Sequence, residues 1–391
     1  MLEIDFTSIE FIFSCVVLLL FIIQLSYWLG LYNVLHLKHK KTSAIDEHPS
    51  ELPPLSVLVV TKDSGKMLHD NLVKILEQDY PEFEVIVVND LSSGEDEDIL
   101  KLLESEYKNL YHTFIPPTAR YISLKKLGIA MGIKASRYDW IVVTEPNCYP
   151  VSSKWLRSMA SHIDYKADIV LGYSNFDLSG VKASMFYRRM VTDALFNSMR
   201  FLGRAIKGKP YMGIGRNMMY RKALYERHKG FARQLNLQRG EDDLFINSLA
   251  TRRNTRVALG PDSVIRVMAP HYCRLWYAEK VSMLVTGSYY QGGTRQSNGF
   301  ESITCFLMHL LSLAGVILSA LSHQWIILGV IAFLWLVRHF SVVMIMKIAA
   351  RDMNEKNVAF LPWFDIVRPM WSLQLKMKYW FRTKYDYLRH N

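Results

Sequence analysis

The stretch Tyr138-Asp139-Trp140-Ile141-Val142-Val143-Thr144-Glu145-Pro146-Asn147-Cys148-Tyr149-Pro150 decides the fold of this chain. Its centre, Trp140 to Val143, is apolar without alternation, which predicts a central strand covered on both faces. Pro146 has no N–H to donate to a neighbouring strand, so the strand must end before it. Glu145 and Asn147 are therefore expected at the carboxyl end of a strand, the edge of an open α/β sheet where ligands bind.

Around this stretch, strands and helices alternate. Leu55 to Thr61 and Phe83 to Val88 are rich in β-branched residues, as strands are. Apolar residues at helical spacing predict helices over Lys66–Gln78, Gly94–Tyr107 and Lys126–Ser136. This order predicts a Rossmann-like, mostly parallel sheet with right-handed crossovers. Further along, helices are predicted over Val151–Ile163 and Lys182–Phe201, and strands over Ala167–Tyr173 and within Tyr211–Tyr220.

Composition and missing motifs narrow the function. The sequence has neither G-x-G-x-x-G after the first strand nor G-x-x-x-x-G-K-[ST], so dinucleotide-binding and P-loop proteins lose their signatures. Lys and Arg outnumber Asp and Glu by 47 to 36, a formal charge of +11, which suggests an anionic partner: a nucleotide, phospholipid headgroups or nucleic acid. The four cysteines are scattered without metal-ligand spacing, which favours a reducing compartment over a disulfide framework.

Three apolar runs predict membrane spans. Phe11 to Leu31 has 21 residues without a charge, and at about 1.5 Å per residue it would cross a bilayer core; a buried soluble helix is the alternative. Acidic residues precede this run and basic residues follow it, which places residue 1 outside and residue 41 in the cytoplasm. Ile303–Leu321 and Trp325–Met346 form a predicted hairpin. Arg338 inside it should face protein or an aqueous groove, or snorkel.

The end of the chain, Phe360 to Tyr385, interleaves aromatic with basic residues. This pattern predicts an amphipathic helix lying in the membrane interface. Nucleic acid could bind a similar pattern, but the neighbouring spans argue against it, so no nucleic-acid partner is expected.

Three adjacent carboxylates, Glu241-Asp242-Asp243, stand at the start of an apolar helical segment. Acidic residues commonly cap the amino end of a helix. Alternatively, mutual repulsion raises the pKa of one of them, which would suit a catalytic base. Local sequence leaves both interpretations open.

Several separate motifs occur in an order typical of one family. They are Ser56-Val57-Leu58-Val59-Val60-Thr61, Gln78-Asp79-Tyr80-Pro81, Val85-Ile86-Val87-Val88-Asn89-Asp90, Lys125-Lys126 ahead of Gly132-Ile133-Lys134-Ala135, Thr144-Glu145-Pro146-Asn147 and Gly240-Glu241-Asp242-Asp243-Leu244. Over roughly residues 54–290 the chain resembles a membrane-bound family 2 glycosyltransferase with a GT-A domain.

The resemblance implies a role for each motif. Thr61, Asp63 and Asp90 would contact the donor nucleotide, and Lys126 would supply a positive charge to it. Glu145 and Asn147 occupy the place of the family's Thr-Asp-Ala-Asp, which holds the donor diphosphate through a divalent metal, Mg²⁺ or Mn²⁺. Asp242 matches the general base, with Glu241 beside it.

Two departures from the family pattern bear on activity. Glu145 is longer than Asp and Asn147 is uncharged, so affinity for a hard divalent cation should fall. The family's Gln-x-x-Arg-Trp survives only as a degenerate Trp276-Tyr277-Ala278-Glu279-Lys280. Trp276 and Lys280 are then either acceptor-side residues, with Arg216 and Asn217, or interfacial anchors.

These observations predict an inverting glycosyltransferase that moves a sugar from a nucleotide sugar to a lipid-linked or membrane-held glycan acceptor. The resemblance implies that the donor is a UDP-sugar. The alternative is a catalytically silent scaffold or nucleotide-sugar-binding protein with the same fold. The catalytic domain would face the cytoplasm from a multi-pass position in a membrane, which the family suggests is a bacterial inner membrane. The expected divisions are a first span (1–37), a linker (38–53), the GT-A domain (54–272), an interfacial segment (273–300), a membrane hairpin (301–347) and a basic tail (348–391).

Overall fold

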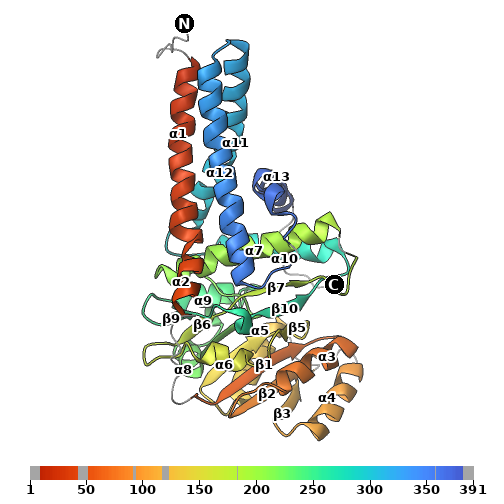
Figure 1. The fold of residues 1–391 in the computed structure, drawn as a ribbon. Coiled ribbons are helices and arrows are strands. Elements are labelled where there is room, and N and C mark those ends of the chain that lie inside the picture. The colour runs from red at the N-terminus through yellow and green to blue at the C-terminus, as the bar shows by residue number, and fades with distance from the viewer. Residues whose placement is uncertain are drawn as a thin grey trace.

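The strand predicted around Trp140 is β4 (Trp140–Thr144), the central strand of a seven-stranded sheet with the order β3-β2-β1-β4-β8-β6-β9. The structure is a computed structural model, and it describes residues 9–42, 52–90, 94–116, 123–182, 184–356 and 358–381. Below three long helices, the sheet forms the heart of an α/β domain (Figure 1). The other strands of this sheet are β1 (Leu55–Thr61), β2 (Phe83–Asn89), β3 (Leu110–Phe114), β6 (Ile169–Leu171), β8 (Met218–Arg221) and β9 (Thr255–Val257).

The sheet is mostly parallel, as predicted. β1 pairs in parallel with β2 and β4, β2 with β3, and β6 with β9. Only β8 runs antiparallel to its neighbours β4 and β6. Because successive side chains point to opposite faces of a strand, Ile141 and Val143 enter one hydrophobic core while Trp140 and Val142 enter the other. Burial on both faces explains why this strand is apolar without alternation.

Helices cover both faces of the sheet. They are α3 (Gly65–Leu76), α4 (Gly94–Glu106), α5 (Leu124–Ala135), α6 (Trp155–Ala160), α7 (Met185–Ile206), α8 (Lys222–Arg227) and α9 (Asp243–Leu249), with 3₁₀ turns at Ala232–Gln234 and Pro261–Ser263. Helix α5 lies very close to β1, because a Cβ on Gly132 would stand 1.9 Å from a methyl carbon of Leu58. This close approach packs the carboxyl half of α5 against the middle of β1.

Two predicted helices have different bounds in the structure. The helix predicted over Val151–Ile163 begins only at Trp155, because Val151 donates to the Val264 carbonyl and the carbonyls of Ser152 and Ser153 accept from Gln78 and Asp79. Those contacts hold residues 151–153 away from helical hydrogen bonding. The helix predicted to end at Phe201 continues to Ile206, because Leu202 and Ala205 are buried in the core.

A second, three-stranded sheet has the order β5-β10-β7 and was not predicted. Its strands are β5 (Cys148–Pro150), β10 (Ile265–Met268) and β7 (Ser174–Asp177). β5 follows directly after the Glu145–Asn147 turn, and the Met268 N–H donates to the Asn147 carbonyl at 2.9 Å. The turn is therefore held between two sheets.

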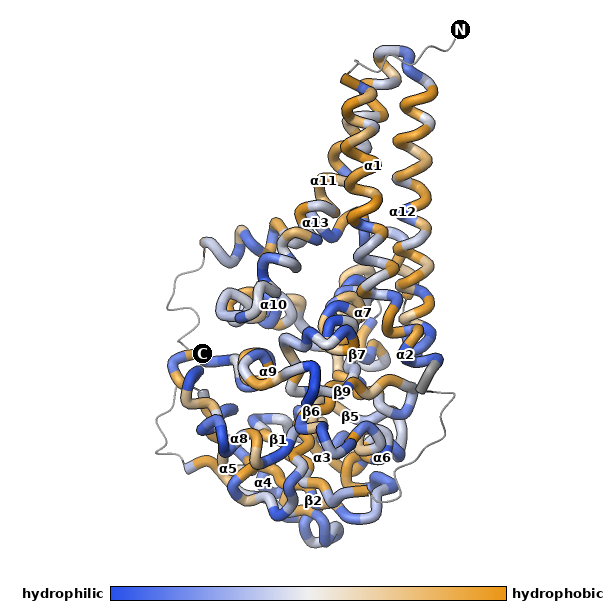
Figure 2. Tube along the Cα trace, turned by 90° about the vertical axis from the view of Figure 1, so that its left-hand side faces the viewer, coloured by the Kyte–Doolittle hydropathy of each residue, from blue (hydrophilic) through white to orange (hydrophobic). Residues whose placement is uncertain are grey.

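By length and composition, three helical segments could cross a membrane: Ile9–Lys40, Thr294–Leu321 and Trp325–Asp352. The first comprises α1 (Ile9–Tyr27), a π-helical turn (Trp28–Tyr32) and part of α2 (Val34–Thr42); the others are α11 (Thr294–Leu321) and α12 (Trp325–Asp352). They stand side by side, and their upper parts are predominantly hydrophobic (Figure 2). The predicted apolar runs and the short link after Leu321 are confirmed as helices and a turn.

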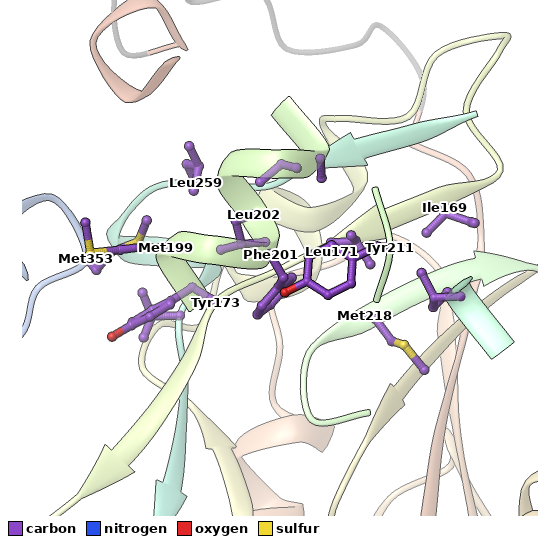
Figure 3. Close-up of a cluster of buried hydrophobic side chains, with 14 of the residues drawn as sticks. Ile169, Leu171, Tyr173, Met199, Phe201, Leu202, Tyr211, Met218, Leu259 and Met353 are labelled. Atoms are coloured by element: carbon purple, nitrogen blue, oxygen red, sulfur yellow. The ribbon is translucent and has the colours of Figure 1, made fainter. Parts of the chain in front are cut away.

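Two further helices lie at the base of this bundle: α10 (Cys273–Gly287) and α13 (Leu361–Trp380). α13 confirms the predicted helix as far as Trp380, and Trp363, Met370 and Trp380 leave its apolar side exposed. Residues 382–385 of the prediction lie outside the described residues. One continuous core joins the bundle to the sheet domain. Figure 3 shows part of it, where Met199 and Leu202 of α7 meet Tyr173 and Met353.

A buried polar cluster also ties the bundle together, and we call it the membrane-side network. Arg338 of α12 is fully buried and pairs with Asp365 of α13 and with Gln24 of α1, at 2.9 Å for the latter. Glu301 of α11 pairs with Arg200 of α7 and with Arg368 of α13. Arg338 thus faces protein, the first of its three predicted environments. The network consists of Gln24, Arg200, Glu301, His309, Arg338, Asp365 and Arg368.

Candidate active site

The predicted donor-side residues follow the carboxyl ends of β1, β2 and β4, which are neighbouring parallel strands. Thr61 is fully buried, and its hydroxyl contacts Asp96, whose carboxylate also accepts the N–H groups of Ser64 and Gly65. Asp63 is exposed on the turn that these bonds shape, with φ at +47°. Asp90 lies 3.2 Å from the Lys62 ammonium. Thr61 therefore shapes the turn, while Asp63 and Asp90 remain accessible.

Glu145 is the centre of a chain of ion pairs. One carboxylate oxygen lies 2.6 Å from the Lys125 Nζ, and the other lies 2.9 Å from the Arg216 Nε. Arg216 continues to Glu279 at 3.0 Å, and Lys125 continues to Glu241 at 3.1 Å. Burial alone would raise the pKa of Glu145, but Lys125 and Arg216 outweigh it and hold that pKa well below its ordinary value. Glu145 is therefore a carboxylate shared by two fixed cations.

Asp242 lies at the N-cap of α9 and lines the same pocket. Its two oxygens accept the Gly215 N–H at 2.9 Å and the Asp243 N–H at 2.7 Å. Burial, with repulsion from Glu241 and Asp243, nevertheless raises the pKa of Asp242 to about 7. Both sequence interpretations of this acidic run thus apply to one residue: Asp242 caps the helix and also has a strongly raised pKa.

The two neighbours of Asp242 have different surroundings. Glu241 is buried, and although burial opposes it, Lys125 lowers its pKa. Its second oxygen, Oε2, has no hydrogen-bond partner among the described residues. Asp243 accepts from the hydroxyls of Thr286 and Tyr290, at 2.5 and 2.8 Å, and so joins α9 to α10. Asp243 is occupied by its neighbours, whereas Glu241 keeps one free acceptor.

These groups line one pocket between the strand ends and α10. The residues of α10 that line it, Glu279, Ser282, Met283 and Thr286, recur at helical spacing and so lie on one face of the helix. The lining residues are Lys125, Glu145, Met212, Ile214, Arg216, Arg239, Glu241, Asp242, Asp243, Glu279, Ser282, Met283 and Thr286.

Glu145 and Asn147, the predicted metal ligands, do not fit a divalent cation in this arrangement. Both oxygens of Glu145 already contact cations. Two unit charges about 4 Å apart repel by roughly 4 kcal/mol at an effective dielectric constant of about 20, so a divalent ion beside Lys125 and Arg216 would be disfavoured. The side-chain oxygen of Asn147 lies 3.4 Å from the Cys148 sulfur and carries no charge. Elsewhere in the described residues, Cys305, His309 and Asp365 lie close enough for a metal, but Asp365 already pairs with Arg338.

Lys126 does not face the pocket. Its ammonium donates to the carbonyls of Gln234, Leu237 and Arg239 at 2.6, 2.5 and 2.9 Å. An ammonium has three N–H donors, so none remains for a nucleotide. The expected donor contact of Lys126 is therefore corrected: this residue holds the loop that precedes Glu241, and Lys125 is the lysine that enters the pocket.

Of the four predicted acceptor-side residues, one lines the pocket and three are held in contacts with other parts of the protein. Arg216 lines the pocket. Asn217 is buried, with its amide bonded to Trp155, Tyr173 and Ser263, so it cannot meet an acceptor. Trp276 is also buried and therefore is not an interfacial anchor, and Lys280 pairs with Asp193. Sequence reasoning missed Lys125 and Glu279 as pocket residues.

Comparison with known proteins bears on the family and the fold of this chain. Residues 56–229 match the sequence model of the family described as Glycosyl transferase family 2. Within the α/β domain, residues 56–229 thus match the family that the sequence motifs predicted, and the mostly parallel sheet agrees with the predicted GT-A fold.

Solved structures extend the likeness beyond that domain. Mannosyltransferase PcManGT from Pyrobaculum calidifontis, in complex with GDP-Man and Mn²⁺, has a TM-score of 0.54 and 16% identity over 92% of this chain and 99% of its own. At that identity the likeness concerns the fold. TarS residues 1–349 from S. aureus, in complex with UDP-GlcNAc, has a TM-score of 0.40 and 17% identity over 84% of this chain and 93% of its own.

Proposed function

We propose that this protein is an inverting glycosyltransferase that moves a sugar from a nucleotide sugar to a hydroxyl of a membrane-held acceptor. The observation that carries the proposal is Asp242, a partly buried carboxyl with a pKa raised to about 7 in a pocket that also holds Lys125 and Arg216. A general base is most effective when its pKa lies near the working pH.

The proposed reaction balances as a single displacement. Asp242 takes the proton of the acceptor hydroxyl, and the acceptor oxygen forms a bond to the anomeric carbon. The bond from that carbon to the donor's phosphate oxygen breaks, and its electron pair leaves with the nucleoside diphosphate. Attack from the side opposite the leaving group inverts the anomeric centre.

Two features support a nucleotide donor and a membrane-held acceptor. Lys125 and Arg216 provide positive charge where negative charge develops on the leaving diphosphate. Asp63 and Asp90 are accessible near the strand ends, where a nucleoside could bind. Met212, Ile214 and Met283 offer an apolar surface in the same pocket, and Met283 belongs to α10, which packs against α13. An acceptor attached to a lipid would approach from this side. A UDP-linked donor remains the choice suggested by the sequence resemblance.

We also propose that the catalytic domain lies in the cytoplasm and that α13 rests in the membrane interface. Basic residues follow the first span and recur in the tail, and positive residues favour the cytoplasmic side. The exposed apolar side of α13 would then be covered by lipid.

The proposal is tested by incubating purified full-length protein in lipid nanodiscs with a panel of labelled UDP- and GDP-sugars and a membrane lipid extract. We expect donor turnover that Asp242→Asn reduces by about 10²–10⁴-fold, since the base is lost. Asp70→Asn, a charge-matched change on the exposed face of α3, serves as the control and should leave turnover unchanged. Equal turnover by Asp242→Asn and the wild type would remove Asp242 from the mechanism.

A non-catalytic nucleotide-sugar-binding protein is the second candidate, because both oxygens of Glu145 are paired with cations and are not available to a catalytic metal. The same panel separates the two functions. Saturable nucleotide binding without turnover of any donor would favour the binding protein.

A further inference from the structure

The contacts of Lys125 suggest how the pocket balances its charge. Its ammonium lies between two carboxylates, 2.6 Å from Glu145 and 3.1 Å from Glu241. One carboxylate follows the end of β4 and the other precedes α9, so the ammonium connects the strand-end side of the pocket to the side that carries the base. One ammonium therefore neutralises two carboxylates from different segments of the chain.

Lys125 is a permanent cation in this position. Burial would lower the pKa of Lys125, but Glu145, Glu241 and Asp242 together raise it well above its ordinary value. Arg216 is fixed in the same way on the other side of Glu145, between that carboxylate and Glu279. The carboxylates therefore orient the two cations, and the cations occupy both oxygens of Glu145.

The pocket keeps donor capacity toward a ligand. The Lys125 ammonium has three N–H groups, of which two are directed at Glu145 and Glu241, and the Arg216 guanidinium has five. Guanidinium and ammonium groups both bind phosphate, the former in a bidentate manner. The amino end of α5, where Lys125 lies in the first turn, adds partial positive charge.

We propose that Lys125 and Arg216 take the place of the divalent cation, so that this protein binds the diphosphate of its donor without a metal. This inference rests on the proposed function and names the residues that hold the donor. Glu145 then acts as a positioning residue: it orients the two cations and coordinates no metal.

Nucleotide binding without any acceptor tests the inference. Full-length protein in nanodiscs is titrated with UDP and with GDP in EDTA, and again with Mn²⁺, by isothermal titration calorimetry. We expect the Kd of the bound nucleotide to agree within about twofold between the two conditions. Wild-type binding that disappears in EDTA and returns with Mn²⁺ overturns the inference while leaving the proposed function intact.

Lys125→Met provides the second arm, because it removes the ammonium and leaves Glu145 and Glu241 free for a metal. In EDTA this variant should bind nucleotide at least about tenfold more weakly, and Mn²⁺ should restore part of the affinity. Lys134→Met, on the exposed last turn of the same helix, is the matched control and should behave as the wild type. Undiminished binding by Lys125→Met in EDTA would also overturn the inference.

The remaining outcomes are also decisive. If Lys125→Met does not fold, the wild-type titrations in EDTA and Mn²⁺ decide alone. If the wild type binds neither nucleotide in either condition, the proposed function fails, and the inference fails with it.

Discussion

The protein contains two buried charge networks of opposite character. The membrane-side network pairs Glu301 with Arg200 and Arg368, and Asp365 with Arg338, and none of its members lines the pocket described above. The pocket network also pairs Glu145, but it holds Asp242 at a raised pKa inside that pocket.

This difference shows which network serves structure and which serves chemistry. Buried charges that satisfy one another hold segments together, because separating them would leave an uncompensated charge. Strongly perturbed groups in a pocket are typical of functional sites. Substitutions in the two networks should therefore fail in different ways: the first by unfolding, the second by loss of activity without unfolding.

The largest effect on stability is expected from Asp365→Asn. Asp365 is buried and pairs with Arg338 and His309, so its neutral replacement leaves the Arg338 charge in the bundle without a counterion. Breaking a buried pair typically costs about 3–5 kcal/mol. We expect a correspondingly lower Tm and lower yield of folded protein in detergent, measured by fluorescence-detected thermal unfolding.

A paired replacement is the control for this effect. Replacing Arg338 by Met together with Asp365→Leu removes both charges, and such replacements are often neutral in stability. The double variant should recover most of the Tm lost by Asp365→Asn. If the double variant is as unstable as Asp365→Asn, the lost Tm does not come from the unpaired charge of Arg338. The other contacts of the network would then be responsible for the stability.

Asp242→Asn should have the opposite effect on stability. The pKa of Asp242 is raised to about 7 in the folded protein, against about 3.9 for an unperturbed Asp, so the folded state binds this proton more tightly. Stability from this group is present at low pH and is lost as pH rises from about 4 through about 7. The variant should therefore raise the Tm most at pH 8 and less at pH 5, and should change it little at pH 4.

The same raised pKa predicts the pH dependence of turnover. Because the base must be ionised, kcat/KM should fall about tenfold for each pH unit below about 7 and level off above it. A pH series of donor turnover checks this slope. A profile flat from pH 5 to pH 8 would contradict Asp242 as the base.

The sequence was sufficient for the features that depend on local pattern. The apolar run before Pro146, the three spans and the acidic start of α9 all follow from residues close together in the chain. The β5-β10-β7 sheet was missed because its strands are three or four residues long and their partners lie far away in the sequence: Ser174 pairs with Ile265 and Cys148 with Val267. The contact of Arg216 with Glu279 likewise has no local signal, since tertiary packing alone creates it.

Lys125 and Lys126 are the clearest case in which local sequence was misinterpreted. Here the sequence did contain a usable signal, the helical spacing of the buried residues that follow. Lys126 precedes Ile129 and Ile133 by three and seven residues, so it shares their buried helical face. Lys125 lies about 100° around the helix from it. The family motif contains both lysines and does not distinguish them. Their positions around the helix do: Lys126 faces the core side and holds a loop, whereas Lys125 faces the pocket.

The smallest expected effect comes from Lys126→Met, which tests that separation. The three carbonyls that Lys126 binds belong to the loop ending just before Glu241, so its loss should loosen the segment that positions the base. We expect kcat to fall about three- to tenfold with little change in the KM for donor, because misplacing a catalytic group lowers the rate without removing a binding contact. Lys134→Met is again the control. A rise in donor KM with kcat unchanged would instead show that Lys126 contacts the donor. Lys125 and Lys126 would then both be donor-binding residues.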